Sequence, residues 1–233
     1  MSATREGPVA SAVAAVRARI AAACARADRD PSEVLLIGAS KTLPADVVRR
    51  ALDAGVTDFA ENYVRELVDK SAAVPARWHF IGKLQRGTVR HVADHASVVH
   101  SGEPGRALEM LARRAAAAGR AIETLIEVDL TDGRQGVRPD ALEAFAAEVT
   151  AMEGLRVVGL MTVPPATPDP EGARAFFVRL RELRDGLAKG TPALRELSMG
   201  MSADYEIAVE EGATMVRIGT ALFGPRPAHA APG

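Results

Sequence analysis

A lysine stands at the end of an apolar run in the first fifth of the chain. Residues 34–42 read Val-Leu-Leu-Ile-Gly-Ala-Ser-Lys-Thr, which predicts a buried strand that finishes on Lys41. Lysine is almost never fully buried unless it is paired, so an amine at this place either reaches water or does chemistry. Desolvation lowers the pKa of a lysine, and the neutral amine is a nucleophile for carbonyl groups. Lys41 is therefore a candidate for bonding to a carbonyl compound.

Two segments near the end of the chain have the residue types of an anion site. Ser-Met-Gly-Met-Ser at 198–202 leads toward a helix that opens at Asp204, and Arg-Ile-Gly-Thr at 217–220 ends the last strand. Small residues let backbone N–H groups approach an anion closely, and hydroxyls add donors. Ordinary tight turns are the alternative for either segment taken alone. Together they predict a phosphate site.

A phosphate site combined with a strand-ending lysine points to pyridoxal 5'-phosphate. This cofactor needs an amine for its aldehyde and an anion cup for its phosphate. Arg217 could then face the pyridine nitrogen, where a permanent cation would keep that nitrogen unprotonated. The alternative for Arg217 is a surface ion pair with Glu210 or Glu211.

The elements that must position these residues alternate between strands and helices. Eight short, largely β-branched runs predict strands at 34–40, 57–61, 78–81, 97–100, 122–129, 157–161, 196–199 and 215–218. Helical patterns between them predict helices at 44–54, 63–73, 85–93, 105–118, 140–152, 170–187 and 204–211. Eight such steps without a linker favour an α/β fold with a single (β/α)8 TIM barrel, in which chemistry belongs at the carboxyl ends of the strands.

An open, doubly wound sheet is the alternative fold. Its dinucleotide site is not favoured, because the first strand runs into Gly-Ala-Ser-Lys at 38–41 and not into GxGxxG. We expect one domain over residues 1–233, with an extra N-terminal helix at about 8–27 and a barrel at about 34–224. The helix is indicated by Val9, Val13, Val16, Ile20 and Cys24 at helical spacing.

Composition narrows the class of protein. The chain has 233 residues, 48% of them hydrophobic, and its 29 basic and 30 acidic residues give a net charge of -1. This balance gives no electrostatic reason to expect nucleic acid or an anionic membrane as a partner. One cysteine and no HExxH-like histidine pair predict neither a disulfide nor a metal site. With no secretory leader and no run of transmembrane length expected, a reducing, cytoplasmic location is predicted.

Three further polar residues have structural interpretations. His79 lies inside a predicted strand and is expected to face inward with its ring hydrogen-bonded. Glu61 ends the second strand, where pairing with a basic residue would hold the strand end. Asp129 ends the fifth strand and is expected to cap a turn.

The motifs resemble the pyridoxal-phosphate homeostasis proteins, also called the YggS or proline synthetase co-transcribed family, which are relatives of the alanine racemase N-terminal barrel. The matching stretches are Ala-Ser-Lys-Thr at 39–42, Glu-Asn-Tyr at 61–63, Trp-His-Phe-Ile-Gly-Lys-Leu-Gln at 78–85, Gly-Leu-Met-Thr-Val-Pro at 159–164, Leu-Ser-Met-Gly-Met-Ser-Ala-Asp at 197–204 and Val-Arg-Ile-Gly-Thr-Ala-Leu-Phe-Gly at 216–224. The last is highly specific, and all of them lie in order along the barrel.

The resemblance implies a role for each site residue. It implies that Lys41 is the Schiff-base lysine, that Asn62 lies near the cofactor ring and that Arg217 faces the pyridine nitrogen. It places Ser198, Ser202, Gly219 and Thr220 around the phosphate. This chain departs from the family pattern at two places: Arg-Gly-Thr at 86–88 replaces the usual sequence after Leu-Gln, and Gln135 stands where a lysine commonly precedes a glycine.

Three functions are weighed. The first is a carrier that holds pyridoxal phosphate on Lys41 and releases it to apo-enzymes, with little or no catalysis and no confidently assigned catalytic residue. The second is an amino-acid racemase, which needs an acid or base on each face of its substrate. The chain stops soon after Gly224 and has only Tyr63 and Tyr205 as tyrosines, so the carrier is favoured. The third, an aldolase with a Schiff-base lysine, fits poorly because Lys41 lies on the first strand. A monomer is expected.

Overall fold

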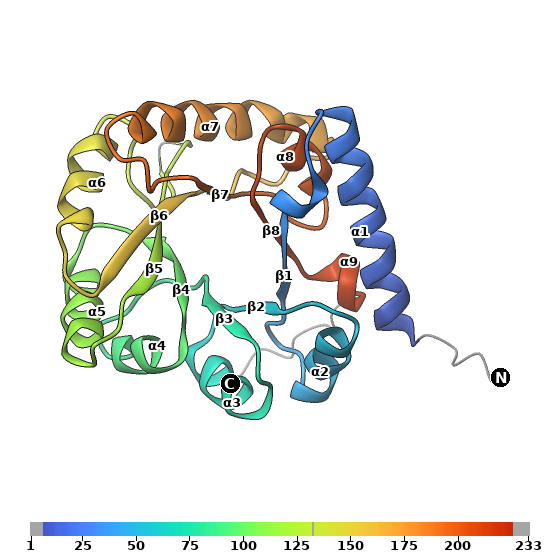
Figure 1. Ribbon diagram of the computed structural model, residues 1–233, viewed down its shortest axis with the longest axis horizontal. Helices are drawn as coiled ribbons and strands as arrows, with labels where there is room; N and C mark the ends of the chain where they lie inside the picture. Colours follow the sequence, from blue (N-terminus) through green and yellow to red (C-terminus); the bar gives the residue numbers. More distant parts are fainter. Residues whose placement is uncertain (1–6, 132, 226–233) are drawn as a thin grey trace.

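Eight parallel strands close into a ring in the computed structural model, which describes residues 7–131 and 133–225 (Figure 1). The strands are β1 Leu35–Ala39, β2 Asp58–Glu61, β3 Arg77–Phe80, β4 Val98–Gly102, β5 Ile122–Glu127, β6 Leu155–Met161, β7 Glu196–Ser198 and β8 Met215–Ile218. Each pairs in parallel with the next, and β8 pairs with β1. The predicted (β/α)8 barrel is confirmed, and the open sheet is excluded.

Helices surround the ring of strands (Figure 1). They are α1 Pro8–Arg26, α2 Ala45–Asp53, α3 Val64–Ala73, α4 Val89–His95, α5 Arg106–Ala117, α6 Leu142–Thr150, α7 Arg174–Ala188, α8 Tyr205–Glu210 and α9 Thr220–Phe223, with 3₁₀ turns at Pro31–Glu33 and Pro170–Ala173. The helix predicted from residue 85 begins only at Val89, because Gly87 disfavours helix and Thr88 instead closes a turn onto the Gln85 carbonyl. The short helix α9 was not predicted, since its four residues show no helical period.

The closing pair β1–β8 aligns residues from the two ends of the sequence. Ile37 lies opposite Arg217, and Gly38 lies opposite Ile218. The chain that follows β1 therefore runs beside the chain that follows β8. This register brings the two most widely separated parts of the predicted site to neighbouring strand ends.

Strand alternation divides the buried residues into two groups. One large apolar cluster packs the outer faces of the strands against the helices. A smaller cluster inside the ring contains Ile37, Ala60, Val98, Leu125, Val158, Met161 and Met215. Successive side chains point to opposite faces, so the inner faces of β2, β3, β4, β7 and β8 also carry the buried polar residues Asp58, His79, His100, Ser198 and Arg217. The interior is thus a packed core with a polar component.

The N-terminal helix α1 lies along the outside of the barrel, against α2, α8 and α9 (Figure 1). The prediction that no segment reaches transmembrane length was wrong for this helix, which is long and apolar enough by length and composition to cross a membrane. Such a helix near an N-terminus is weak evidence of a span, and here Val13, Val16, Ile20, Ala23 and Cys24 are buried against the barrel. Its arginines bond neighbouring elements at the edge of this contact: Arg26 pairs with Glu210 of α8 at 2.6 Å.

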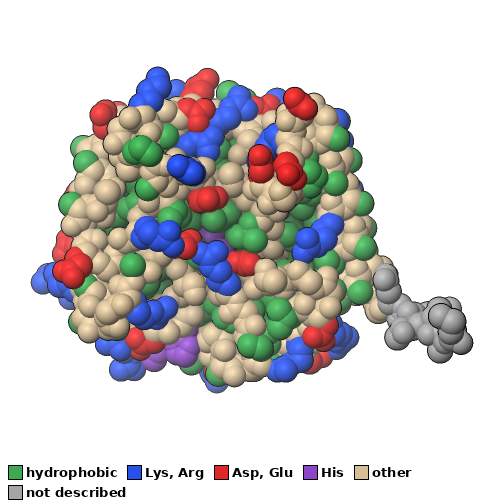
Figure 2. All heavy atoms as spheres, viewed as in Figure 1, with side chains coloured by type: hydrophobic (Ala, Val, Ile, Leu, Met, Phe, Trp, Pro, Cys, Tyr) green, Lys and Arg blue, Asp and Glu red, His purple; other side chains and the backbone are tan. Residues whose placement is uncertain are grey.

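Charges of both signs cover the outside of the barrel. Lys and Arg side chains are interspersed with Asp and Glu on the face shown in Figure 2. This mixture agrees with the near-zero net charge and gives no extended basic surface on that face.

Gly159 allows β6 and β7 to approach each other closely, and a side chain at this position should therefore destabilise the protein. It pairs with Glu196, and a Cβ at Gly159 would lie 2.0 Å from the Glu196 carbonyl oxygen. We expect Gly159→Ala to lower the free energy of unfolding by about 3 kcal/mol, because the strands must separate. The matched control is Gly186→Ala in α7, where nothing lies within 4 Å of the new methyl group. That control should stabilise the helix by about 0.5 kcal/mol or more. Equal urea midpoints for the two variants would contradict the close approach.

Candidate functional site

Lys41 follows β1 at the carboxyl end of the barrel, as the sequence predicted. The preceding residue, Ser40, is fully buried, and Lys41 itself is half-buried. Thr42 has a φ of 66°, the left-handed region that β-branched residues rarely adopt. The backbone on both sides of the lysine is therefore tightly specified by its surroundings.

A buried ion-pair network lies behind Lys41. The Ser40 hydroxyl donates to Glu61 Oε1 at 2.6 Å, and Lys70 Nζ donates to Glu61 Oε1 and to the Ser40 carbonyl, each at 2.7 Å. Lys70 also donates to Glu66 Oε2 at 2.6 Å, and the same Glu66 oxygen accepts the Thr42 N–H at 2.7 Å. The network thus binds both residues that flank Lys41.

The predicted pairing of Glu61 with a basic residue is confirmed, and the partner is Lys70 on α3. Glu61 is fully buried and Lys70 is 5% exposed. Burial raises the pKa of Glu61, and the hydrogen bonds from Lys70 and Ser40 only partly offset that rise. Sequence reasoning missed Lys70. The signal that could have found it is its position four residues after Glu66 and nine after Glu61 on the helix that follows β2.

Polar atoms without hydrogen-bond partners gather around Lys41. Within residues 7–131 and 133–225, the buried side-chain atoms that lack a partner are Thr42 Oγ1, Glu61 Oε2, Asn62 Oδ1 and Tyr205 Oη. Three of these four flank Lys41 in sequence or across the β1–β2 pair. Since buried polar atoms are normally hydrogen-bonded, their concentration here favours a polar ligand at this end of the barrel.

Arg217 points into the barrel and is 4% exposed. It donates through Nη1 to the Ser198 carbonyl at 2.9 Å and to the Ser198 hydroxyl, and through Nη2 to the Thr162 carbonyl at 2.9 Å. Burial lowers the pKa of Arg217 to about 10, against the opposing effect of Glu127 and Asp204. The guanidinium is still a cation at neutral pH.

The alternative of a surface ion pair for Arg217 was wrong. Glu210 and Glu211 instead pair with Arg174 on α7, at 2.8 and 2.7 Å. The side-chain alternation of β8 sends Arg217 to the inner face of the strand, away from these carboxylates.

Ser202, Gly219 and Thr220 lie together at the ends of β7 and β8. The Ser202 hydroxyl accepts the backbone N–H groups of Gly219 and Ala221, at 3.2 and 3.1 Å. Gly200 permits the turn before it with a φ of +90°, and a Cβ there would lie 2.6 Å from the Ala208 side chain. The structure thus brings Ser202 and Gly219 together, with both amides bonded to the Ser202 hydroxyl, and the phosphate site stays a prediction.

Ser198 lies apart from this loop. It is fully buried on β7, where its hydroxyl contacts Arg217 and, at 2.8 Å, His100 Nδ1. Its side chain is therefore engaged inside the barrel and not at the Ser202 loop. Asn62, in contrast, follows β2 directly and lies at the same end of the barrel as Lys41.

Two carboxylates at the end of β5 differ in their ionisation. Burial, together with the charge of Glu103, raises the pKa of Glu127 to about 7 against the opposing effect of Arg217, while Gln135 donates to Glu127 Oε2 at 2.8 Å. Burial also raises the pKa of Asp129, but hydrogen bonds from Thr131, Gly133 and Arg134 outweigh it and lower the value to about 2. Asp129 thus caps a turn, as predicted.

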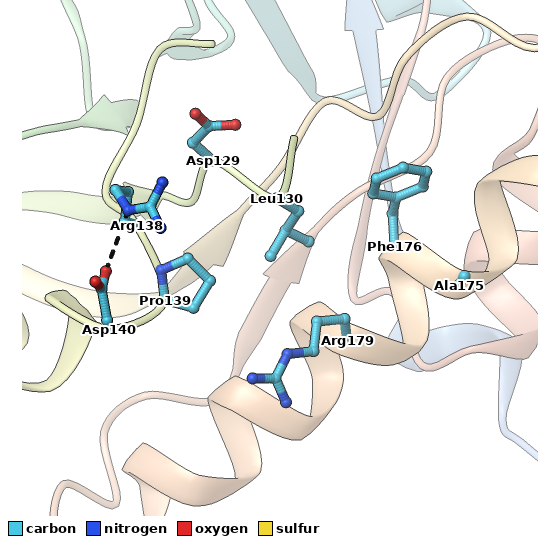
Figure 3. Close-up of a pocket in the computed structure, with 8 residues that line it drawn as sticks. All are labelled: Asp129, Leu130, Arg138, Pro139, Asp140, Ala175, Phe176 and Arg179. Atoms are coloured by element: carbon cyan, nitrogen blue, oxygen red, sulfur yellow. Dashed lines mark ion pairs between the residues drawn. The ribbon is translucent and has the colours of Figure 1, made fainter. Parts of the chain in front are cut away.

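A groove between the loop after β5 and α7 does not coincide with the residues predicted to contact the cofactor (Figure 3). It has a volume of about 430 Å³ and is lined by Asp129, Leu130, Arg138, Pro139, Asp140, Ala175, Phe176 and Arg179. These residues come from the loop after β5 and from α7. No residue predicted to contact the cofactor lines it, so the groove is not assigned to the site.

Known proteins match both the fold and most of the chain length. Residues 12–227 match the family described as the alanine racemase N-terminal domain. A relative from Pseudomonas aeruginosa, named pyridoxal phosphate homeostasis protein, is 42% identical over 223 residues, which are 94% of this chain and 96% of the relative. The solved structure of PipY from Synechococcus elongatus with PLP bound is 34% identical, with a TM-score of 0.81, and covers 93% of this chain and 100% of that one.

Alanine racemase is a more distant structural neighbour. The enzyme from Corynebacterium glutamicum has a TM-score of 0.71 at 15% identity, and the match covers 96% of this chain but 63% of the enzyme. At this identity the likeness shows the barrel fold alone.

Removing the Lys70 charge tests the network behind Lys41. We expect Lys70→Met to lower the free energy of unfolding at pH 7 by about 3–5 kcal/mol, because Glu61 is left buried without its cation. This loss of stability should be smaller at acid pH. Without Lys70, the pKa of Glu61 in the folded protein rises further above its value in the unfolded chain. The variant therefore loses stability as the pH rises from the unfolded-state pKa to the folded-state pKa of Glu61.

Two comparisons complete this test by chemical denaturation. Lys70→Met combined with Glu61→Gln leaves no charge behind and should recover most of the loss. Arg50→Met removes an exposed pair with Asp46 and should leave the stability almost unchanged. A Lys70→Met protein as stable as Arg50→Met would contradict the structural role of the buried pair.

Proposed function

The chain belongs to the pyridoxal phosphate homeostasis protein family, within the wider alanine racemase N-terminal domain family, and we propose that it binds pyridoxal 5'-phosphate as a Schiff base on Lys41. In this proposal it acts in the cytoplasm as a carrier or reservoir of the cofactor and passes it to apo-enzymes, with little or no catalysis of its own. The name of the P. aeruginosa relative and the PLP bound to PipY support this function.

The observation that carries the proposal is the placement of an amine beside an anion cup. Gly38 pairs with Ile218, so the residues that follow the two strands, Lys41 after β1 and Gly219–Thr220 after β8, leave the barrel side by side. Pyridoxal phosphate carries its aldehyde and its phosphate-bearing methylene group on adjacent carbons of the ring. The Lys41 amine and the Ser202 hydroxyl, which the Gly219 and Ala221 amides hold in place, would match these two groups.

The residues around Lys41 fit this cofactor. The hydroxyl of Thr42 and the amide oxygen of Asn62 are buried atoms without a hydrogen-bond partner among the described residues, and they would be available to polar groups of the cofactor. Ser202 holds the Gly219 and Ala221 amides in position and keeps its own hydroxyl hydrogen for a phosphate oxygen. Arg217 presents a cation from the inner side of β8, which would leave a pyridine nitrogen unprotonated.

When bound, the cofactor would supply an aldehyde for the amine and an electron-accepting ring. The protein's own contribution is to hold both ends. Ser198 is assigned here to Arg217 and not to the phosphate, because its hydroxyl already bonds Arg217 and His100.

Racemization is the alternative function, and the position of Tyr205 argues against it. Tyr205 is 1% exposed on α8, where Arg19 of α1 covers its ring on the outside of the barrel. It therefore cannot reach a substrate at the barrel mouth. Tyr63 precedes α3 and is 53% exposed. Loss of α-deuterium from D- or L-amino acids at enzyme-like rates would establish the racemase in place of the carrier.

Lys41→Ala should abolish covalent binding of the cofactor. Titration of the native protein with pyridoxal phosphate should give an imine absorbance band near the visible edge, and borohydride reduction should fix the adduct on the peptide that contains Lys41. Lys83→Ala removes an exposed lysine paired with Glu103 and is the matched control, which should behave as the native protein does. A native protein that gives no band, or a band that survives in Lys41→Ala, would refute the assignment.

Ser202→Ala should weaken phosphate recognition selectively. We expect about a tenfold higher dissociation constant for pyridoxal 5'-phosphate, because a hydrogen bond to a charged oxygen is lost and two amides lose their acceptor. Binding of pyridoxal, which lacks the phosphate, should be unchanged. Ser71→Ala on α3 removes a half-buried hydroxyl that contacts His95, away from these strand ends, and serves as the control. An equal loss for both ligands would place Ser202 outside the phosphate site.

A further inference from the structure

A row of hydrogen-bonded side chains crosses the interior of the barrel from Asp58 to Arg217. Asp58 Oδ1 lies 2.9 Å from His79 Nε2, and His79 Nδ1 lies 2.8 Å from His100 Nε2. His100 Nδ1 lies 2.8 Å from the Ser198 hydroxyl, which contacts Arg217 Nη1. The predicted inward orientation of His79 is confirmed. All five side chains are buried, and they come from five different strands.

The two ends of the row determine its direction. An ionised carboxylate can only accept hydrogen bonds, and a guanidinium can only donate them. Each neutral imidazole between them has one donor and one acceptor. With Asp58 ionised and both rings neutral, only one arrangement satisfies every contact: Arg217 donates to Ser198, Ser198 to His100, His100 to His79, and His79 to Asp58. Both histidines must then carry their proton on Nε2.

The surroundings favour these protonation states. Burial lowers the pKa of both His79 and His100, against the opposing effect of Asp58 on His79. For His100 the charges of Arg217 and Arg77 lower the pKa further, as would a proton on His79. Burial raises the pKa of Asp58, but hydrogen bonds from His79 and Thr57 outweigh this and lower it overall. The row therefore holds one negative charge at Asp58 and one positive charge at Arg217, with neutral groups between.

Arg217 depends on this row because its direct partners are all uncharged. Its acceptors are the carbonyl oxygens of Ser198 and Thr162 and the Ser198 hydroxyl. Within the described part of the chain, no carboxylate lies within 4 Å of its guanidinium. A chain of aligned hydrogen bonds strengthens each of its members, so the Asp58 charge makes the Ser198 oxygen a better acceptor for Arg217.

We propose that Asp58, His79, His100 and Ser198 are positioning residues for Arg217, and that Asp58, at the other end of the hydrogen-bonded row, sets the direction of the row that holds this cation. The part of the inference that concerns the cofactor rests on the function proposed above. The row itself does not, since it is a property of the protein alone.

Histidine tautomers test the row in the cofactor-free protein. ¹⁵N NMR should show His79 and His100 as neutral Nε2–H tautomers from about pH 6 to about pH 8, the range over which an ordinary histidine titrates. Asp58→Leu should turn this single pattern into a mixture of tautomers. An Nδ1–H tautomer for either ring, or a protonated ring at pH 7 in the native protein, would overturn the proposal without any variant having to fold.

Two variants test whether the row reaches Arg217. Exchange of the Arg217 guanidinium protons with solvent should become faster in Ser198→Ala and in Asp58→Leu. Thr124→Val is the control, because it removes a buried hydroxyl on β5 that bonds only the Ile122 carbonyl. Unchanged exchange in both row variants, or equal acceleration in the control, would contradict the positioning role.

Cofactor affinity then tests the functional consequence by a double-mutant cycle. Ser198→Ala and Asp58→Leu should each raise the dissociation constant for pyridoxal phosphate by about fivefold, and the double variant should be no weaker than Ser198→Ala alone, since linked residues are not additive. Additive effects would show that Asp58 acts independently of the row and would overturn the proposal. A native protein that does not bind pyridoxal phosphate would refute the proposed function, while the tautomers and the guanidinium exchange would still decide the row.

Discussion

The pairing of the first strand with the last is the contact on which the whole site depends. Lys41 and Arg217 are separated by most of the sequence, and only the β1–β8 register makes them neighbours. The site therefore exists only in the closed barrel. The closed ring of strands also explains why single residues from many strand ends can form one site, to which each segment of the chain contributes only a part.

Two buried polar networks lie beneath this end of the barrel and have different tasks. The network of Ser40, Glu61, Glu66 and Lys70 holds backbone, because it bonds the Ser40 carbonyl and the Thr42 N–H on either side of Lys41. The row from Asp58 to Ser198 holds a side chain, the guanidinium of Arg217. Buried charges contribute little net stability compared with apolar residues of similar volume. Their retention here is better explained by the geometry that they impose than by the energy that they supply.

The sequence predicted those features that depend on a single residue type or on the hydrophobic periodicity of one segment. Eight apolar runs predicted eight strands, and the strand-end position of Lys41 and the Ser202 and Gly219 turns were found from their local types. The networks were missed because they depend on register. Nothing near Asp58 in sequence shows that His79 lies beside it, and for Lys70 the only local signal is its spacing from Glu66 and Glu61. Ser198 illustrates the same limit: its hydroxyl looked suitable for a phosphate, but strand alternation turns it into the barrel, toward Arg217.

The partners of Arg217 also explain why a carboxylate does not lie beside it. A directly bound Asp or Glu would neutralise the guanidinium and reduce its effect on a cofactor ring nitrogen. Neutral acceptors leave the full charge available, but they offset less of the cost of burying it, and the pKa of Arg217 falls to about 10 in consequence. Glu127 and Asp204 raise the pKa of the guanidinium without bonding it, and Asp58 is linked to it only through the hydrogen-bonded row. The row stabilises the cation through the polarity of its bonds, while the negative charge stays too far away to pair with the guanidinium.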